Sequence, residues 1–95
     1  MFAFKPDEDL SARWFETFPE GGLQLMFYFE NGYGASVIRH RGSWGNKEGL
    51  FELAVIKGDR NYWTLHKNNP VANGDVLGYL TIEDVNNALR RIKNL

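Results

Sequence analysis

The dipeptide Asn31-Gly32, which separates two apolar runs, is the sequence feature that most constrains the fold. Residues 23–30 (LQLMFYFE) and residues 33–40 (YGASVIRH) both have the aromatic and β-branched content that is typical of strands. An Asn-Gly pair between such runs is typical of a type I′ turn, because both residues tolerate a positive φ. The sequence therefore predicts an antiparallel hairpin whose loop is only these two residues.

A two-residue loop determines the register of the hairpin and therefore the two faces that it presents. The expected pairs are Glu30 with Tyr33, Tyr28 with Ala35, Met26 with Val37, and Leu25 with Ile38. The face expected to form the core carries Leu23, Leu25, Phe27, Phe29, Gly34, Ser36 and Ile38. The opposite face carries Gln24, Met26, Tyr28, Tyr33, Val37 and Arg39. The apolar members of this second set are candidates for a homodimer interface.

Further strands are expected after the hairpin. Residues 50–57 (LFELAVIK) and residues 62–66 (YWTLH) are predicted to form a third and a fourth strand. Residues 67–75 are turn-forming, and residues 76–80 (VLGYL) are interpreted as a short strand or an extended approach to the last element. Short connections favour a meander, so residues 23–66 are predicted to form an antiparallel sheet of about four strands.

The C-terminal segment has the local signals of a helix from about residue 82 to residue 93. Thr81 and Asp84 are spaced as a capping box, with Asp in place of the preferred Glu, and Leu80 with Val85 forms a hydrophobic staple. Apolar side chains recur at helical spacing at Ile82, Val85, Ala88, Leu89 and Ile92. We therefore expect this helix to pack on one face of the sheet, which makes the fold class α+β.

The first 20 residues allow two interpretations. Asp7 or Asp9 is suited to cap a short helix that would place Leu10, Trp14 and Phe18 on one side. Alternatively, an apolar start with phenylalanines at positions 2 and 4 is compatible with an edge strand.

Length and composition predict a single domain spanning residues 1–95 in an intracellular setting. A chain of 95 residues has room for one core, and aromatic residues make up 15% of it, which is enough to fill a small core. The absence of cysteine excludes a disulfide framework and thiolate chemistry. The start MFAFKPDED lacks a basic leader, and no run approaches the length of a membrane span, so we expect no membrane partner.

The sequence carries no recognisable catalytic or metal-binding motif. His40 and His66 both lie at predicted strand ends beside basic residues, an arrangement that repels a cation. No nucleophile elbow and no glycine-rich phosphate loop of the required spacing is present. Glu83 and Asp84 are explained by the positive end of the predicted helix. We therefore expect a non-enzymatic protein without a metal or a cofactor.

The charge distribution points to one candidate interaction surface. The net charge is −1, but residues 31–67 contain six bases against three acids, whereas residues 1–30 contain six acids against two bases. The candidate partner-binding residues are Arg39, His40, Arg41, Trp44, Lys47 and Arg60. Bases around an aromatic suit an acidic protein patch, or phosphates with a stacked base. The competing interpretation is a solvated connector in which Trp44 covers one end of the core.

Three stretches carry a resemblance to a known group of proteins. Residues 31–38 (NGYGASVI), 49–55 (GLFELAV) and 75–85 (DVLGYLTIEDV) resemble small, uncharacterised bacteriophage-encoded proteins that combine such a hairpin, such a strand and a GYLT-capped final helix. The resemblance implies a phage origin, a setting in the host cytoplasm and an accessory role. That role is non-enzymatic binding to a host or phage protein, including inhibition of a host defence factor. The alternative is a nucleic-acid-binding module that uses the basic segment 39–67, which the net charge disfavours.

Overall fold

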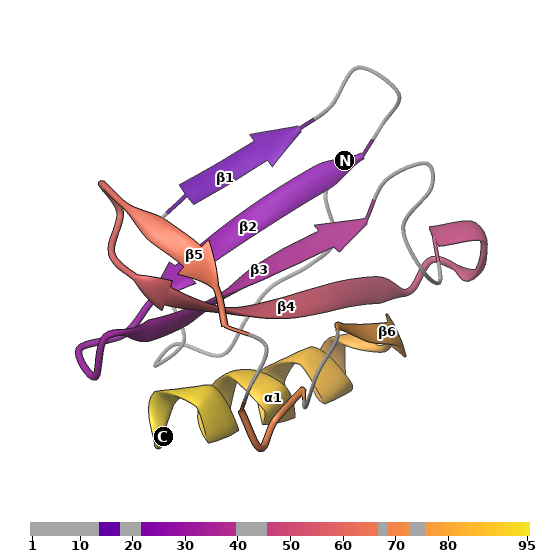
Figure 1. Ribbon diagram of the computed structural model, residues 1–95. Helices are drawn as coiled ribbons and strands as arrows, with labels where there is room; N and C mark the ends of the chain where they lie inside the picture. Colours follow the sequence, from indigo (N-terminus) through magenta and orange to yellow (C-terminus); the bar gives the residue numbers. More distant parts are fainter. Residues whose placement is uncertain (1–13, 18–21, 40–45, 67–68, 73–75) are drawn as a thin grey trace.

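The protein folds into an antiparallel sheet with one helix packed against it, so the predicted α+β class is confirmed (Figure 1). The computed structural model describes residues 14–17, 22–39, 46–66, 69–72 and 76–95. Its elements are β1 (Trp14–Thr17), β2 (Leu23–Tyr28), β3 (Tyr33–Arg39), η1 (Asn46–Glu48), β4 (Phe51–Gly58), β5 (Trp63–Leu65), β6 (Leu77–Leu80) and α1 (Ile82–Lys93).

The sheet is a meander whose last strands share one edge. Strands β1 to β4 are hydrogen-bonded in chain order, and β5 and β6 both pair with the outer edge of β4. Strand β5 pairs with Ile56–Gly58 at one end of β4, whereas β6 pairs with Phe51 and Leu53 at the other end. The meander expected over residues 23–66 is therefore present, and β1 and β6 extend it.

The hairpin between β2 and β3 forms as predicted, but its register differs by one residue. The amide of Phe29 donates to the carbonyl oxygen of Tyr33 at 2.8 Å, and the amide of Gly32 donates to the carbonyl oxygen of Phe29 at 3.1 Å. The loop is therefore Glu30, Asn31 and Gly32, and only Gly32 has a positive φ, at 86°. A three-residue loop that ends in a left-handed residue is the next commonest hairpin connection after the two-residue one.

The extra loop residue reverses the predicted faces of β3. Leu25 pairs with Val37 and Phe27 with Ala35, so Val37 lies in the core, whereas the sequence placed Ile38 there. Tyr33 also packs against the core rather than on the opposite face. The assignment of β2 was correct, since Leu25 and Phe27 are buried on the side of the helix.

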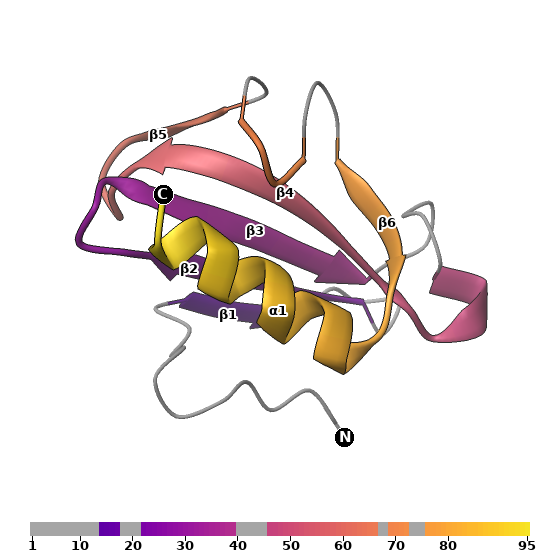
Figure 2. The same ribbon diagram turned by 90° about the horizontal axis from the view of Figure 1, so that it is seen from below.

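The core lies between the sheet and α1, which contacts β3, β4 and β6 (Figure 2). Its buried members are Leu23, Leu25, Phe27, Ala35, Val37, Phe51, Leu53, Val55, Val71, Ala72, Val85, Ala88, Leu89 and Ile92. The helix has its predicted bounds and capping box: the amide of Asp84 donates to Thr81 Oγ1 at 3.1 Å, and the amide of Thr81 donates to Asp84 Oδ2 at 3.0 Å. Ile82, which was expected on the apolar stripe, is 38% exposed.

Asn31 joins the hairpin loop to the C-terminal end of the helix. Its side-chain Nδ2 donates to the carbonyl oxygen of Ile92 at 2.9 Å and to that of Lys93 at 3.1 Å. Its Oδ1 accepts a hydrogen bond from the amide of Tyr33 at 3.0 Å. The last carbonyl groups of a helix have no hydrogen-bond partner within the helix, and the Asn31 side chain provides a donor for two of them.

The start of the described chain is a strand rather than the predicted helix. Trp14 is paired with Met26 and Thr17 with Leu23, so β1 forms the edge of the sheet next to β2. Sheet pairing with residues about ten positions ahead overrides the helical spacing of the apolar residues. The other residues named for the N-terminal helix or edge strand lie outside the described residues. Among the described helices, none is long and apolar enough to cross a membrane.

Candidate functional site

The structure separates the residues of the predicted basic surface. His40, Arg41 and Trp44 lie outside the described residues. Arg39 ends β3 beside the start of β4, and Lys47 lies in η1, whereas Arg60 follows the far end of β4. Strand β4 has 8 residues, and a strand rises about 3.3 Å per residue, so Arg60 lies on the order of 20 Å or more from Arg39. Of the described candidates, Arg39 therefore does not share one surface with Arg60.

Arg39 has a structural role at the end of the core. Its guanidinium carbon lies 5.1 Å from the centre of the Phe51 ring, a cation–π arrangement. It also donates to the carbonyl oxygen of Gly49 at 3.4 Å. Register places Arg39 opposite Leu23 on the helix side of the sheet. Arg39 thus covers the edge of the apolar layer, whereas the connector interpretation concerned Trp44, which lies outside the described residues.

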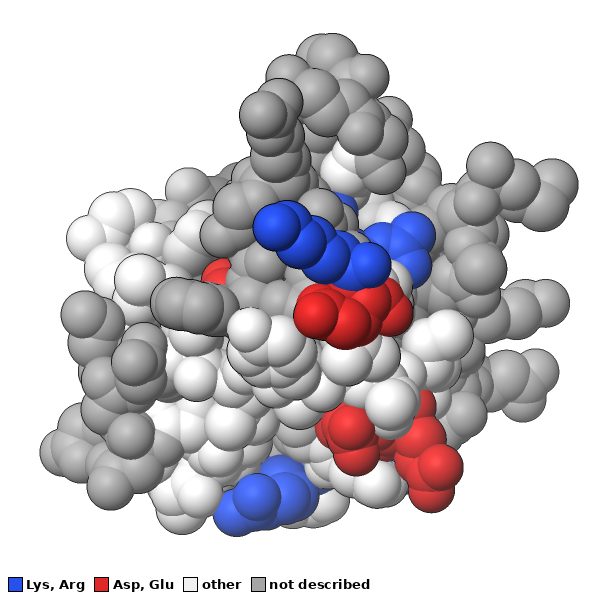
Figure 3. All heavy atoms as spheres, turned by 90° about the vertical axis from the view of Figure 1, so that its right-hand side faces the viewer, with Lys and Arg blue, Asp and Glu red and all other residues white. Residues whose placement is uncertain are grey.

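At the end of the molecule that carries η1, basic and acidic side chains are mixed (Figure 3). Figure 3 views the end of the molecule that carries η1, and there blue basic side chains lie directly beside red acidic ones. The mixture of charges at the η1 end weakens its attraction for a polyanion. Lys57 lies near the other end of β4, on the helix side of the sheet, with its Nζ 6.0 Å from the centre of the Tyr33 ring.

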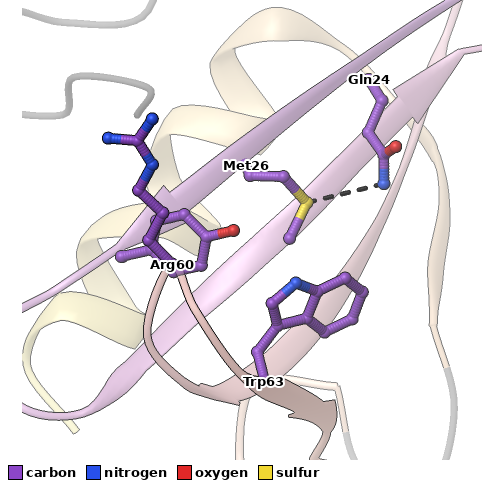
Figure 4. A pocket seen from close by; sticks show the side chains of 5 residues that line it. Gln24, Met26, Arg60 and Trp63 are labelled. Atoms are coloured by element: carbon purple, nitrogen blue, oxygen red, sulfur yellow. Dashed lines mark hydrogen bonds between the residues drawn. The ribbon is translucent and has the colours of Figure 1, made fainter. Parts of the chain in front are cut away.

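A hollow of about 290 Å³ lies on the sheet face away from the helix, which we call the second face (Figure 4). It is lined by Gln24, Met26, Tyr28, Arg60 and Trp63. The first three come from β2, Trp63 from β5, and Arg60 from the turn between β4 and β5. Its volume is at the lower end of the range for ligand pockets, roughly 300 to 1,000 Å³.

Two backbone features bring these five residues together. Alternate residues of a strand share a face, so Gln24, Met26 and Tyr28 project from β2 on the side opposite Leu25 and Phe27. The return of the chain after β4 uses Gly58, whose φ is 133°, where an added Cβ would overlap the Tyr62 carbonyl oxygen.

Asp59 completes the turn that positions Arg60. Its Oδ1 accepts hydrogen bonds from the amides of Asn61 at 2.8 Å and Tyr62 at 3.1 Å, and its own amide donates to the carbonyl oxygen of Tyr62 at 2.9 Å. An aspartate that accepts from the next backbone amides is a common turn-forming arrangement. The carboxylate therefore serves the turn, and Arg60 projects from it toward the hollow.

The side of the hollow formed by β2 is anchored by hydrogen bonds. Gln24 Nε2 donates to Ser36 Oγ at 3.0 Å and, more weakly, to Met26 Sδ at 3.5 Å, the contact drawn in Figure 4. Met26 is almost fully buried, at 3% exposure. Because these contacts use both N–H groups of the amide, Gln24 presents its carbonyl oxygen as the remaining polar atom.

Besides the Gln24 amide and the Trp63 indole, the polar groups of the described lining are the Tyr28 phenol and the Arg60 guanidinium. Burial raises the pKa of the Tyr28 hydroxyl above its ordinary value of 10.0, the nearby Arg60 charge opposes this shift, and Asp59 adds to it. The phenol is therefore neutral at pH 7 and can donate or accept a hydrogen bond. With the side chains that the structure describes, the Arg60 guanidinium makes no hydrogen bond or ion pair.

The lining residues of the hollow provide apolar, hydrogen-bonding and ionic groups. Across the described ranges, no group of three or more His, Cys, Asp or Glu side chains lies close enough together to hold a metal ion. His66 packs its ring against Tyr33, with ring centres 5.2 Å apart, on the helix side of the sheet and away from the hollow. The hollow offers aromatic walls, a thioether and one cation.

The sequence identified only part of this site. Arg60 was chosen as part of a basic cluster, and Met26 and Tyr28 were placed correctly on the second face. Gln24 was on that face but was given no role, and Trp63 was missed. The signal that could have found Trp63 is the tight turn at residues 58–62, which returns the chain alongside β4.

Comparison of the chain with protein-family models, with curated proteins and with solved structures found no match.

Proposed function

We propose that this protein acts without enzymatic chemistry, by binding a partner protein through the hollow on its second face. The observation that carries the proposal is the composition of the lining: Trp63, Tyr28, Met26 and Arg60 meet in one concavity. Trp, Tyr, Met and Arg are the residue types enriched in protein interfaces, and Trp, Tyr and Arg dominate their binding hot spots.

The surroundings of the hollow support this role. Leu65 is 53% exposed and lies on the same face of β5 as Trp63, so apolar surface continues beyond Trp63 along this strand. Strand pairing holds the β2 and β5 residues in place, and a rigid platform reduces the entropy that is lost on binding. The resemblance in the hairpin, β4 and the helix start adds the biological setting: a phage accessory protein whose partner is a host or phage protein in the host cytoplasm.

A direct test is affinity capture from host-cell lysate with three forms of the tagged protein. The first is wild type, the second carries Arg60→Ala and Trp63→Ala in the hollow, and the third carries Lys47→Ala and Ile82→Ala at other exposed positions. All three are first compared by thermal melting, so that only folded forms enter the assay.

We expect a protein that wild type and the Lys47/Ile82 variant retain and that the Arg60/Trp63 variant loses. Its affinity for the purified forms is then measured by titration calorimetry, where loss of a hot-spot pair raises Kd by roughly a hundredfold or more. Equal retention by all three forms would remove the hollow from the binding site and refute the proposal.

A further inference from the structure

We propose that the hollow accepts an acidic side chain of the partner together with a neighbouring aromatic side chain. This inference rests on the proposed function, because it assigns the chemistry of the partner segment that docks there. The charge of the hollow, the rest of its lining and the placement of the other bases each contribute to it.

Among the described side chains, the hollow has one positive charge and no negative charge. Arg60 is the one charged residue among its described lining residues, and its guanidinium has no anionic partner among the side chains that the structure describes. The nearest acidic residue in sequence, Asp59, already accepts two backbone hydrogen bonds through Oδ1 within the turn. A planar guanidinium pairs with a carboxylate through two parallel hydrogen bonds, so a carboxylate is the complementary group.

The apolar lining residues determine which side chain of the partner fits beside that carboxylate. Trp63 and Tyr28 provide ring faces, and Met26 provides a buried thioether, which makes favourable contacts with aromatic rings. A volume of about 290 Å³ is of the size that one or two side chains need. An acidic residue next to a phenylalanine, tyrosine or tryptophan satisfies both the charged and the apolar parts of the lining.

The placement of the other described bases favours a polypeptide over a nucleic acid. A nucleic-acid strand carries a phosphate at every nucleotide and is held by several bases along its path. Arg39 and Lys57 lie on the helix side of the sheet, where each stacks on an aromatic ring, so neither lines the hollow. A single guanidinium in an aromatic hollow matches a single carboxylate.

Two capped tetrapeptides provide the probe: acetyl-Gly-Phe-Glu-Gly-amide and its neutral isostere acetyl-Gly-Phe-Gln-Gly-amide. Binding to the isotope-labelled whole chain is followed at millimolar peptide through the indole N–H signal of Trp63 and the side-chain amide of Gln24. The proteins compared are wild type, Arg60→Gln, Arg60→Lys and, as a matched control, Lys57→Gln. A short oligothymidylate is tested in parallel.

We expect the Glu peptide to shift both signals and to bind wild type about tenfold more tightly than the Gln peptide. Arg60→Gln should remove this preference while leaving the weak binding of the Gln peptide unchanged, because the double-mutant comparison isolates the charge pair. Arg60→Lys should keep part of the preference, since it retains charge but loses the planar fork. Lys57→Gln should behave as wild type.

The inference fails if the two peptides bind wild type equally, if neither shifts the two signals, or if Arg60→Gln leaves the Glu preference intact. Tighter, Arg60-dependent binding of the oligothymidylate would replace it with nucleic-acid recognition. These outcomes are separate from the capture experiment: a partner lost from the Arg60/Trp63 variant while both peptides bind alike upholds the proposed function and refutes only the carboxylate.

Discussion

Replacement of Asn31 by alanine tests whether the hairpin loop holds the end of the helix in place. The side-chain Nδ2 of Asn31 lies within hydrogen-bond distance of the carbonyl oxygens of Ile92 at 2.9 Å, Lys93 at 3.1 Å and Leu95 at 3.4 Å. Its Oδ1 accepts from the amide of Tyr33 at 3.0 Å. Asn31→Ala removes all of these contacts. Asn31 does not have a positive φ, so alanine can adopt the same backbone conformation.

The expected loss of stability follows from the number of hydrogen bonds. The amide group has two N–H donors, so it fully satisfies at most two of the three carbonyl groups, and the contact with Tyr33 adds a third bond. The net contribution of each bond is about 0.5 to 1.5 kcal/mol, and the exposed position of Asn31 places it at the low end. We expect a loss of about 2 kcal/mol, which lowers Tm by roughly 8 to 16 °C in a domain of this size.

Asn31→Asp distinguishes the effect of the side-chain donor Nδ2 from that of the acceptor Oδ1. The new carboxylate keeps an oxygen for the amide of Tyr33, but it replaces the donor and faces the negative end of α1. This environment disfavours the charged form, so its pKa in the folded state is raised above the unfolded value of about 3.9. A raised pKa means that the penalty is largest at neutral pH and is recovered as the pH falls through that pKa.

Urea-induced unfolding followed by far-UV circular dichroism at pH 7 and near pH 4 measures these effects. The matched control is Asn87→Ala, which removes an exposed asparagine from α1 and should be neutral or slightly stabilising, since alanine favours helix. The reasoning is refuted if Asn31→Ala is within about 0.5 kcal/mol of this control. The helix end would then be held by apolar packing alone.

Three further substitutions have defined outcomes. Gly34→Ala places a Cβ where it overlaps the carbonyl oxygen of Phe27, so we expect the free energy of unfolding to fall by roughly 3 kcal/mol or more. This loss should appear as a large decrease in Tm. A Tm near that of wild type would contradict the register of β2 and β3. Thr81→Ala removes the N-cap and should cost about 1 kcal/mol in urea unfolding, whereas Thr81→Ser should cost far less. The pKa of Tyr28 is raised in the folded state, so its contribution to stability is present below pH 10 and is lost as the pH rises through the folded pKa. Tyr28→Phe should flatten this alkaline decline, measured by urea unfolding between about pH 9 and 11, and an unchanged decline would contradict the burial of the phenol.

The helix shows which features of the fold can be predicted from local sequence. Its bounds at Ile82 and Lys93 were predicted correctly because the capping box, the apolar stripe and the charged ends all lie within the segment itself. The hairpin was predicted for the same reason. Its register was not, because Asn31 is used to hold the helix end 61 residues away, and Gly32 alone takes the positive φ.

The candidate site depended more strongly on tertiary structure. The sequence grouped Arg60 with Arg39 by charge, but the length of β4 separates them, and the turn held by Asp59 brings Arg60 to Tyr28 instead. The position of residues in the sequence does not reveal which side chains on different strands come into contact, because that depends on strand pairing and register. Trp63 joined the site only through the pairing of β5 with β4.

By itself, the sequence determined the α+β class, the helix with its caps, the presence of the hairpin and the apolar face of β2, since each depends on residues within a few positions of one another. Only the tertiary structure decided the register of β3, the strand at residues 14–17 and the hollow on the second face. These features depend on hydrogen bonds and packing between segments that are distant in the chain, whose free energies outweigh local preferences of a few tenths of a kcal/mol per residue.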